Sequence, residues 1–343
     1  MNSENKEKIY SGNVLEIVNE VNRVSGIATF SKNFFQHPHL TSIIKTTVPS
    51  RPFLSLVSGI TKSRVVYCHL LYTIDIFAIT LCCIVFRKPL ILVSHGNLIL
   101  RNKSRYRKLF FLTVLRKVML FCNSSTQYLN QNEKERSFKL TSSSFICPPY
   151  LSRDSRTKEI ANSLSRVVRK SGVNNNYYKF CYLGANYYER KGFDRMLTIC
   201  RAIKKAGKNV TIDMIGVIET DEISKKVSQF KLEGVINFID PIYGEEKSKK
   251  LASYDALVLL SRSEGWPMVV LESIDLNIPV IVTSETNVAD LVAKYELGVV
   301  VKDFKCVEWH RELNSLSLYS TKFFKDHDSN IGYEIIRDKF LCK

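Results

Sequence analysis

The sequence predicts an α/β protein built from two doubly wound parallel sheets. Strand-like apolar runs alternate with helical patterns along the chain, an order that is typical of parallel sheets covered by helices. The length of 343 residues suits two domains of ordinary size. With 45% apolar and 11% aromatic residues, the chain has enough material for two cores. We therefore expect a folded chain with two sheets.

The first half is predicted to open with a strand at 13–18, a loop at 19–25 and a helix that begins at 26–31. Two strand-like runs, 65–69 and 89–95, flank the apolar stretch 70–86. That stretch has 17 residues and contains Asp75, whereas about 20 apolar residues are needed to cross a bilayer. We interpret it as the buried helix of a strand–helix–strand unit rather than as a membrane span. A basic helix and a strand with a helix cap at 118–125 are expected to follow.

Composition divides the chain into four predicted segments. The first domain covers 1–150 and ends at two prolines, 148–149, through which a central strand or helix cannot continue. A polar linker is expected at 151–176, the second domain at 177–320, and a helical tail, a candidate to return to the first domain, at 321–343. Strand-like runs of the second domain lie at 178–184, 210–216, 236–239, 256–260, 279–283 and 298–301.

The net charge of +17 is concentrated in the first half, where residues 1–159 hold 23 Lys and Arg against 9 Asp and Glu. The densest basic cluster lies among aromatic residues and comprises Arg101, Lys103, Arg105, Arg107, Lys108, Arg116 and Lys117. Such a stretch is suited to an anionic lipid surface or to a nucleic-acid backbone. It is also compatible with a solvated helix face. No recognised nucleic-acid motif accompanies it, so lipid is the favoured partner.

Cysteine usage and the first residues bear on the compartment. The nine cysteines include no Cys-x-x-Cys pair, which argues against a disulfide framework and a zinc site and favours a reducing compartment. Residues 1–8 carry charges of both signs and no apolar region follows them, so no secretory signal is predicted. We expect a cytoplasmic protein.

The most informative segment is 261–272, which reads SRSEGWPMVVLE. It places Glu264 and Glu272 eight positions apart, on either side of a Gly-x-Pro turn. Pro267 fits the first position of a helix, where a missing N–H costs nothing, and backbone amides at a helix start point toward an anion. The segment therefore suits a nucleotide-sugar, with one carboxylate for the sugar, amides for the diphosphate and one carboxylate for the ribose hydroxyls.

This segment resembles the Glu-x7-Glu motif of the retaining glycosyltransferases of family 4, the group 1 glycosyltransferases. The resemblance implies the GT-B fold, in which two Rossmann-like domains face a cleft. It further implies that Glu272 binds the ribose of the donor and that Glu264 lies near the donor sugar. Gly265, Trp266 and Pro267, between them, are expected to contact phosphate and sugar.

Two further segments of the second half are similar to the donor-diphosphate segment of that family. Gly184 ends a strand, and Arg190 and Lys191 precede a glycine soon afterwards. The family commonly has Arg directly after the first glycine, where this chain has Ala185. We assign Lys191, with Arg190, to the negative charge that develops on the leaving diphosphate. Gly216, at the end of the next strand, is included in the donor site.

In the first half, Gly26 and Ile27 are similar to the family's loop that faces the acceptor and the donor phosphate. His95 lies at the end of a strand and resembles the family's His-Gly turn. Because open α/β sheets bind ligands beyond the carboxyl ends of their strands, His95 is a candidate active-site group. His69 ends the neighbouring strand and is interpreted as structural.

Together these observations predict a retaining glycosyltransferase that moves a sugar from a nucleotide-diphosphate donor to a glycan or a polyprenyl-linked oligosaccharide. A role in surface polysaccharide assembly is expected, at the inner face of the cytoplasmic membrane. No cofactor and no metal are predicted, because the one Asp-x-Asp motif, 326–328, lies far from any strand end. The alternatives are a nucleotide-sugar epimerase of the same fold and a non-catalytic protein that binds glycan or nucleic acid.

Overall fold

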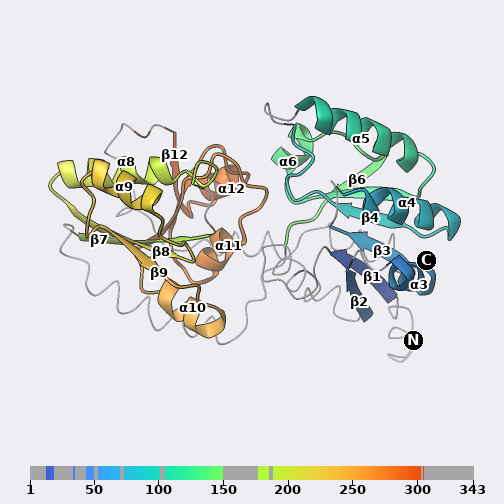
Figure 1. The fold of residues 1–343 in the computed structure, drawn as a ribbon, viewed down its shortest axis with the longest axis horizontal. Coiled ribbons are helices and arrows are strands. Elements are labelled where there is room, and N and C mark those ends of the chain that lie inside the picture. The colour runs from blue at the N-terminus through green and yellow to red at the C-terminus, as the bar shows by residue number, and fades with distance from the viewer. Residues whose placement is uncertain are drawn as a thin grey trace. The chain divides into compact units, whose positions relative to one another are not determined.

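The computed structural model describes residues 13–18, 34, 44–49, 53–69, 73–100, 105–149, 177–184, 188–302 and 304. The chain divides into two compact units near residue 152. Each unit contains one parallel sheet with helices packed against it (Figure 1). The predicted α/β class with two parallel sheets is confirmed. Gly26, Ile27, Ala185, the linker at 151–176 and the tail at 321–343 lie outside the described residues.

The first unit holds a six-stranded sheet in the order β2-β1-β3-β4-β5-β6, and every pair of neighbours is parallel. Its strands are β1 (Asn13–Val18), β2 (Ile44–Pro49), β3 (Val65–Cys68), β4 (Leu90–Val93), β5 (Ser124–Tyr128) and β6 (Ser143–Ile146). Its helices are α3 (Phe53–Lys62), α4 (Asp75–Val85), α5 (Arg105–Met119) and α6 (Gln131–Arg136). The direction of strand order reverses between β1 and β3, which makes this pair the switch point of the sheet.

The apolar stretch near Asp75 forms a helix between two strands, as the sequence predicted, but only one face of this helix is buried. It forms α4 between β3 and β4, two strands in which every residue is buried. Short, continuous apolar strands of this kind occur where helices cover both faces of a parallel sheet. Within the described residues, no helix is both long enough and apolar enough to cross a membrane.

The strand predicted at 118–125 is wrong in position. Helix α5 continues to Met119, Leu120 and Phe121 are exposed in the turn that follows, and the strand is β5, from Ser124 to Tyr128. Sequence reasoning missed β5 because its residues are mostly polar. They are buried because their side chains find partners; Gln127 Nε2, for example, donates to the Cys147 carbonyl at 2.8 Å.

The second unit holds a six-stranded parallel sheet in the order β12-β11-β10-β7-β8-β9. Its strands are β7 (Tyr177–Leu183), β8 (Asn209–Ile215), β9 (Ile236–Ile239), β10 (Ala256–Leu259), β11 (Val280–Thr283) and β12 (Gly298–Val301). Its helices are α8 (Phe193–Lys205), α9 (Asp221–Gln229), α10 (Gly244–Leu251), α11 (Met268–Asp275) and α12 (Ala289–Lys294). Helices α8 and α9 lie on one face of the sheet and α10 on the other (Figure 1). The strand order reverses between β7 and β10.

Candidate functional site

Most candidate residues of the second unit gather at the switch point of its sheet. Strands β7 and β10 are parallel neighbours, so their carboxyl ends lie at the same edge. Gly184 follows β7, and the segment that contains Glu264 follows β10. A doubly wound sheet places its ligands at this position, because the connections from the two strands leave in opposite directions. The topology therefore brings together residues about 80 positions apart in the sequence.

Gly192 allows the loop after β7 to pass close to the loop after β10. It has φ +70° and ψ 37°, a left-handed conformation, and stands at the N-cap of α8. A Cβ atom at this position would lie 2.0 Å from the Leu260 carbonyl oxygen. Only glycine fits both requirements, and the two residues before it, Arg190 and Lys191, are thereby held against the other loop.

The central contact of the site joins Lys191 to Glu264. Lys191 Nζ lies 2.7 Å from Glu264 Oε1, and the Ser261 hydroxyl donates to the same oxygen at 2.8 Å. The two charged side chains are 14% and 10% exposed, so the ion pair is largely shielded but still reaches solvent. A cation held in this way is fixed in position and can attract the negative charge of a phosphate.

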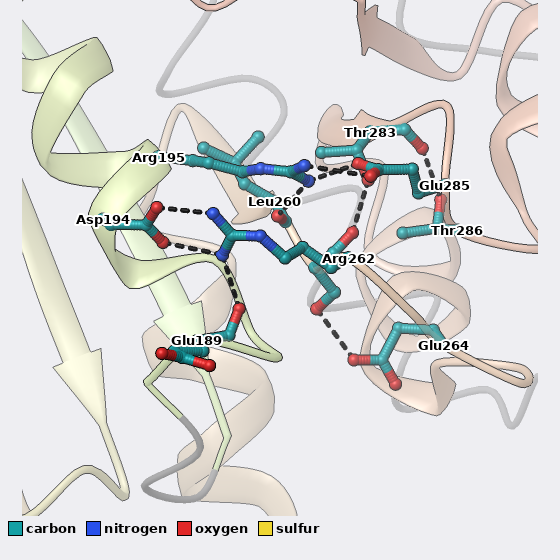
Figure 2. A network of polar contacts seen from close by, with 10 residues as sticks. Glu189, Asp194, Arg195, Leu260, Arg262, Glu264, Thr283, Glu285 and Thr286 are labelled. Atoms are coloured by element: carbon teal, nitrogen blue, oxygen red, sulfur yellow. Dashed lines mark hydrogen bonds and ion pairs between the residues drawn. The ribbon is translucent and has the colours of Figure 1, made fainter. Parts of the chain in front are cut away.

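Arg262 holds the two loops together (Figure 2). Its guanidinium donates to both oxygens of Asp194, at 2.8 and 2.6 Å, and to the Glu189 carbonyl at 2.6 Å. Its backbone N–H donates to the Arg190 carbonyl at 2.8 Å. The hydrogen bonds from Arg262 lower the pKa of Asp194, and Asp194 in turn raises the pKa of Arg262. Arg262 therefore connects the loop of Glu264 to the loop of Lys191.

A second group of contacts supports the loop after β10 from the side of β11. Thr283 donates through its hydroxyl to the Ser261 carbonyl at 2.6 Å. Arg195, on α8, binds Glu285 through both guanidinium nitrogens and also reaches the Leu260 carbonyl at 3.4 Å (Figure 2). The loop that carries Glu264 is thus supported by residues that follow β7 and by the end of β11, as well as by its own side chains.

Helix α11 begins one residue later than predicted. Pro267 occupies the N-cap with ψ 104°, an extended conformation, and Met268 is the first helical residue. Glu272 is the fifth residue of the helix, about a turn and a half from its start. Its carboxylate binds Lys247 of α10, with Nζ at 2.8 and 2.9 Å from the two oxygens. Sequence reasoning did not identify Lys247, because the contact joins two helices that follow different strands.

The remaining donor-site candidates surround these pairs. Gly216 has a left-handed backbone, φ +78°, directly after β8, and Gly184 directly follows β7. Gly265 and Trp266 lie in the loop between Glu264 and α11. The buried Nε1 of Trp266 has no hydrogen-bond partner among the described residues. An unpaired buried N–H is costly, so this indole nitrogen is a donor that a ligand can satisfy.

The first unit has a different group of side chains at its own switch point. Glu16, on β1, accepts a hydrogen bond from Nε2 of His69, at 3.0 Å, and His69 Nδ1 lies 2.8 Å from Nε2 of His95. Glu16 and His69 are almost completely buried. Burial and the neighbouring His69 lower the pKa of His95 well below its usual value, while Glu16 acts in the opposite direction. We call these three residues the imidazole chain.

The sequence predicted only part of the imidazole chain. His95 was a candidate site residue, whereas His69 was interpreted as structural and Glu16 was not identified. An acidic residue inside an apolar strand was the available signal, because a buried carboxylate needs a partner. With Glu16 ionised and both rings neutral, His69 carries its proton on Nε2 and His95 donates from Nε2 to Nδ1 of His69.

A buried carboxylate also shapes the turn that carries His95. Glu133 accepts hydrogen bonds from the Ser94 hydroxyl and the Gly96 N–H, and from the Leu129 N–H at 2.7 Å. Burial raises the pKa of Glu133, against the effect of these hydrogen bonds. His95 has φ +44°, a left-handed conformation that a non-glycine residue seldom adopts. In the described part of the chain, no group of His, Cys, Asp and Glu has the arrangement of a metal site.

Comparisons with known proteins agree with this geometry. Residues 165–322 match the family of glycosyl transferases group 1, which confirms the family resemblance inferred from the sequence. A search of curated protein sequences finds no match. Among solved structures, HepE from Anabaena in complex with UDP is similar over 96% of both chains, with a TM-score of 0.67 and 13% identity.

Two other solved structures have the same fold. WaaG, a glycosyltransferase involved in lipopolysaccharide biosynthesis, is similar over 95% of this chain and 99% of its own, with a TM-score of 0.55 and 14% identity. Sucrose-phosphate synthase from Thermosynechococcus elongatus is similar over 96% and 95%, with a TM-score of 0.62 and 10% identity. At these identities the likeness establishes the fold alone, and that fold is GT-B.

Proposed function

Because residues 165–322 form a group 1 glycosyltransferase domain, we propose that the protein is a retaining hexosyltransferase that uses a nucleotide-diphosphate sugar. The observation that carries this proposal is the pair of lysine–carboxylate contacts, Lys191–Glu264 and Lys247–Glu272, beside the switch point of one sheet. The solved HepE structures hold UDP, UDP-glucose, or UDP with glucose, which supports a uridine donor here.

The roles within the second unit follow from charge and position. Glu272 binds the ribose hydroxyls, and Gly184, Gly216 and the α11 start accommodate the diphosphate. Lys191, with Arg190, stabilises the negative charge that grows on the leaving diphosphate. Glu264 fixes the ammonium of Lys191 and faces the donor sugar. The two glutamates are therefore not a glycosidase pair, which would flank the scissile bond on both sides. In this proposal the positive charge comes from side chains, without a metal or cofactor.

We propose a glycan or polyprenyl-linked acceptor, bound by the basic first unit at an anionic membrane surface. Along α5, Tyr106, Phe110 and Val114 recur every four residues and are 86%, 73% and 37% exposed. Leu120 and Phe121 continue this apolar surface after the helix. Basic residues lie among them on α5, including Arg116 and Lys117 in its last turn. Exposed aromatic side chains among basic ones suit the interface of an anionic bilayer.

The membrane proposal is tested with vesicles. We expect the protein to sediment with vesicles that contain anionic lipid and to remain in solution with neutral ones, and added salt should reduce binding. Phe110→Ser with Phe121→Ser should weaken sedimentation at unchanged net charge, because only apolar contact is removed. Equal sedimentation of wild type and this variant would show that the apolar surface is not used.

A thermal-shift panel tests the proposed donor. UDP, GDP, ADP and CMP, each with its common sugar conjugates, are added to wild type and to Glu272→Ala. A ligand that binds the folded state raises the melting temperature by mass action. At a hundredfold excess over Kd, the ligand adds about 2.7 kcal/mol to the free energy of unfolding. We expect one nucleoside diphosphate to stabilise the wild type and not the variant. If no nucleotide stabilises the wild type, the transferase proposal is wrong.

A further inference from the structure

The side chain of Lys247, on α10, pairs with Glu272 on another helix, α11. Helix α10 carries three lysines with three different partners. Lys249 pairs with Glu245 one turn earlier on the same helix, at 2.9 Å, and Lys250 approaches Asp213 at 3.6 Å. Lys247 instead crosses to α11 and contacts both oxygens of Glu272. Within α10 it is therefore the lysine whose charge is committed to the candidate ribose site.

The bidentate geometry has a consequence for binding. An ionised carboxylate has about four lone-pair positions, two on each oxygen. An ammonium that contacts both oxygens, at 2.8 and 2.9 Å, occupies one position on each. One position on each oxygen is left, and these two lie on the outer sides of the carboxylate and point away from each other. A ribose hydroxyl can thus bind Glu272 from an outer side without displacing Lys247.

The environment of the pair makes Lys247 important for this arrangement. The side chains of Lys247 and Glu272 are 23% and 21% exposed, so both are mostly shielded from water yet open on one side. Without Lys247, the carboxylate would lose its charged partner and its fixed orientation. A flexible carboxylate binds a diol more weakly, because ordering it opposes binding.

We propose that Lys247 is the positioning residue of the ribose subsite and that the Lys247–Glu272 pair makes this site selective for ribonucleotides over 2′-deoxyribonucleotides. This inference rests on the proposed function, since it takes Glu272 to be the ribose ligand. The opposite possibility is a latch, in which Lys247 blocks Glu272 until a ligand displaces it. The two readings predict opposite effects of removing the ammonium.

Isothermal titration calorimetry with UDP and 2′-deoxy-UDP separates these readings. If the thermal-shift panel identifies another base, the ribonucleoside and 2′-deoxyribonucleoside diphosphates of that base are used instead. The wild type should bind the ribonucleotide more tightly. Lys247→Met should weaken ribonucleotide binding on the order of tenfold, as loss of a shielded charged partner does, and should leave deoxyribonucleotide binding nearly unchanged. Lys249→Met is the matched control, because it removes the same charge from the same helix without touching Glu272.

Three results would overturn the proposal. Tighter ribonucleotide binding by Lys247→Met would favour the latch, and unchanged binding would mean that Lys247 has no role in the site. An equal loss for both nucleotides would indicate a general electrostatic effect. Independent effects of Lys247→Met and Glu272→Gln in a double-mutant cycle would show that the residues do not act together. Should Lys247→Met fail to fold, Lys247→Gln replaces it. If the wild type binds no nucleoside diphosphate, the proposed function is wrong as well. In the three results above the wild type still binds, so failure of the inference can be told apart from failure of the proposed function.

Discussion

The two sheets of this protein have related topologies but carry different chemistry at their switch points. In the first unit, Glu16, His69 and His95 form a chain of one carboxylate and two imidazoles, of which Glu16 and His69 are buried. In the second, two lysines pair with two carboxylates, at 2.7 and 2.8 Å, in partly exposed positions. The fold determines where a ligand binds, whereas the side chains at that position determine which ligand it is.

The difference in burial also separates their roles. Lys191 of the second unit is partly exposed to solvent, so an incoming diphosphate can share its charge. In the imidazole chain Glu16 and His69 are buried, and the pKa of His95 is lowered, so its ring is neutral at physiological pH. We therefore interpret the second switch point as the place where anionic charge is stabilised. The first is suited to hydrogen bonds with neutral groups such as hydroxyls.

The largest effect is expected from Gly192→Ala, which disrupts the second switch point only. The new Cβ would meet the Leu260 carbonyl oxygen at 2.0 Å, at a residue with φ +70°. We expect a loss of about 2–5 kcal/mol in the free energy of unfolding, from the steric overlap and the left-handed backbone together. Chemical denaturation measures it.

Gly207→Ala is the matched control for that experiment. Gly207 has nearly the same φ, +73°, but a Cβ added there would meet no atom within 4 Å. This variant should lose only about 1–2 kcal/mol, from backbone strain alone. Equal losses for the two variants would mean that the close approach of the two loops at Gly192 does not stabilise the unit.

Removal of the central cation should have the next largest effect. Lys191→Met should reduce kcat/KM for release of nucleoside diphosphate from its sugar donor about 100-fold, as loss of a group that stabilises developing negative charge does. Arg190→Met should cost less, because the backbone carbonyl of Arg190 is the atom that the adjacent loop holds. A larger effect of Arg190→Met would reverse the assignment of the two residues. Thermal melts of both variants check that they fold.

The smallest expected effect is a pH dependence of stability that arises in the first unit. His95 has a lower pKa in the folded protein than in the unfolded chain, where it is about 6.5. Below that pH the unfolded chain binds a proton that the folded protein does not, so stability falls as the pH decreases. One such proton contributes at most about 1.4 kcal/mol per pH unit. Well above the pKa of the unfolded chain the ring is neutral in both states, so His95 does not make the stability depend on pH.

His95→Asn isolates this contribution, since Asn tolerates the left-handed backbone at this position. The free energy of unfolding of the wild type minus that of the variant, measured by denaturation between pH 5 and pH 7, should increase as the pH rises. Subtraction is needed because Glu133, whose pKa is raised, contributes a slope of opposite sign in acid. Parallel stability curves for the two proteins would contradict a lowered pKa of His95.

Local sequence patterns were enough to predict the fold class, most strands and the family that residues 165–322 match. Apolar runs predicted β1, β9 and β12 at their observed bounds. The segment at 261–272 indicated the family because a loop, a turn and a helix start lie within a dozen residues there. These are local properties, which a sequence displays directly.

Which side chains meet depends on the tertiary structure. Lys191 and Glu264 are 73 residues apart, Lys247 and Glu272 are 25 apart, and Glu16 and His69 are 53 apart. No local pattern connects such pairs, because their contact depends on strand order and on the reversal at each switch point. The polar strand β5 was missed for the same reason: its burial depends on partners such as the Cys147 carbonyl, which folding alone supplies.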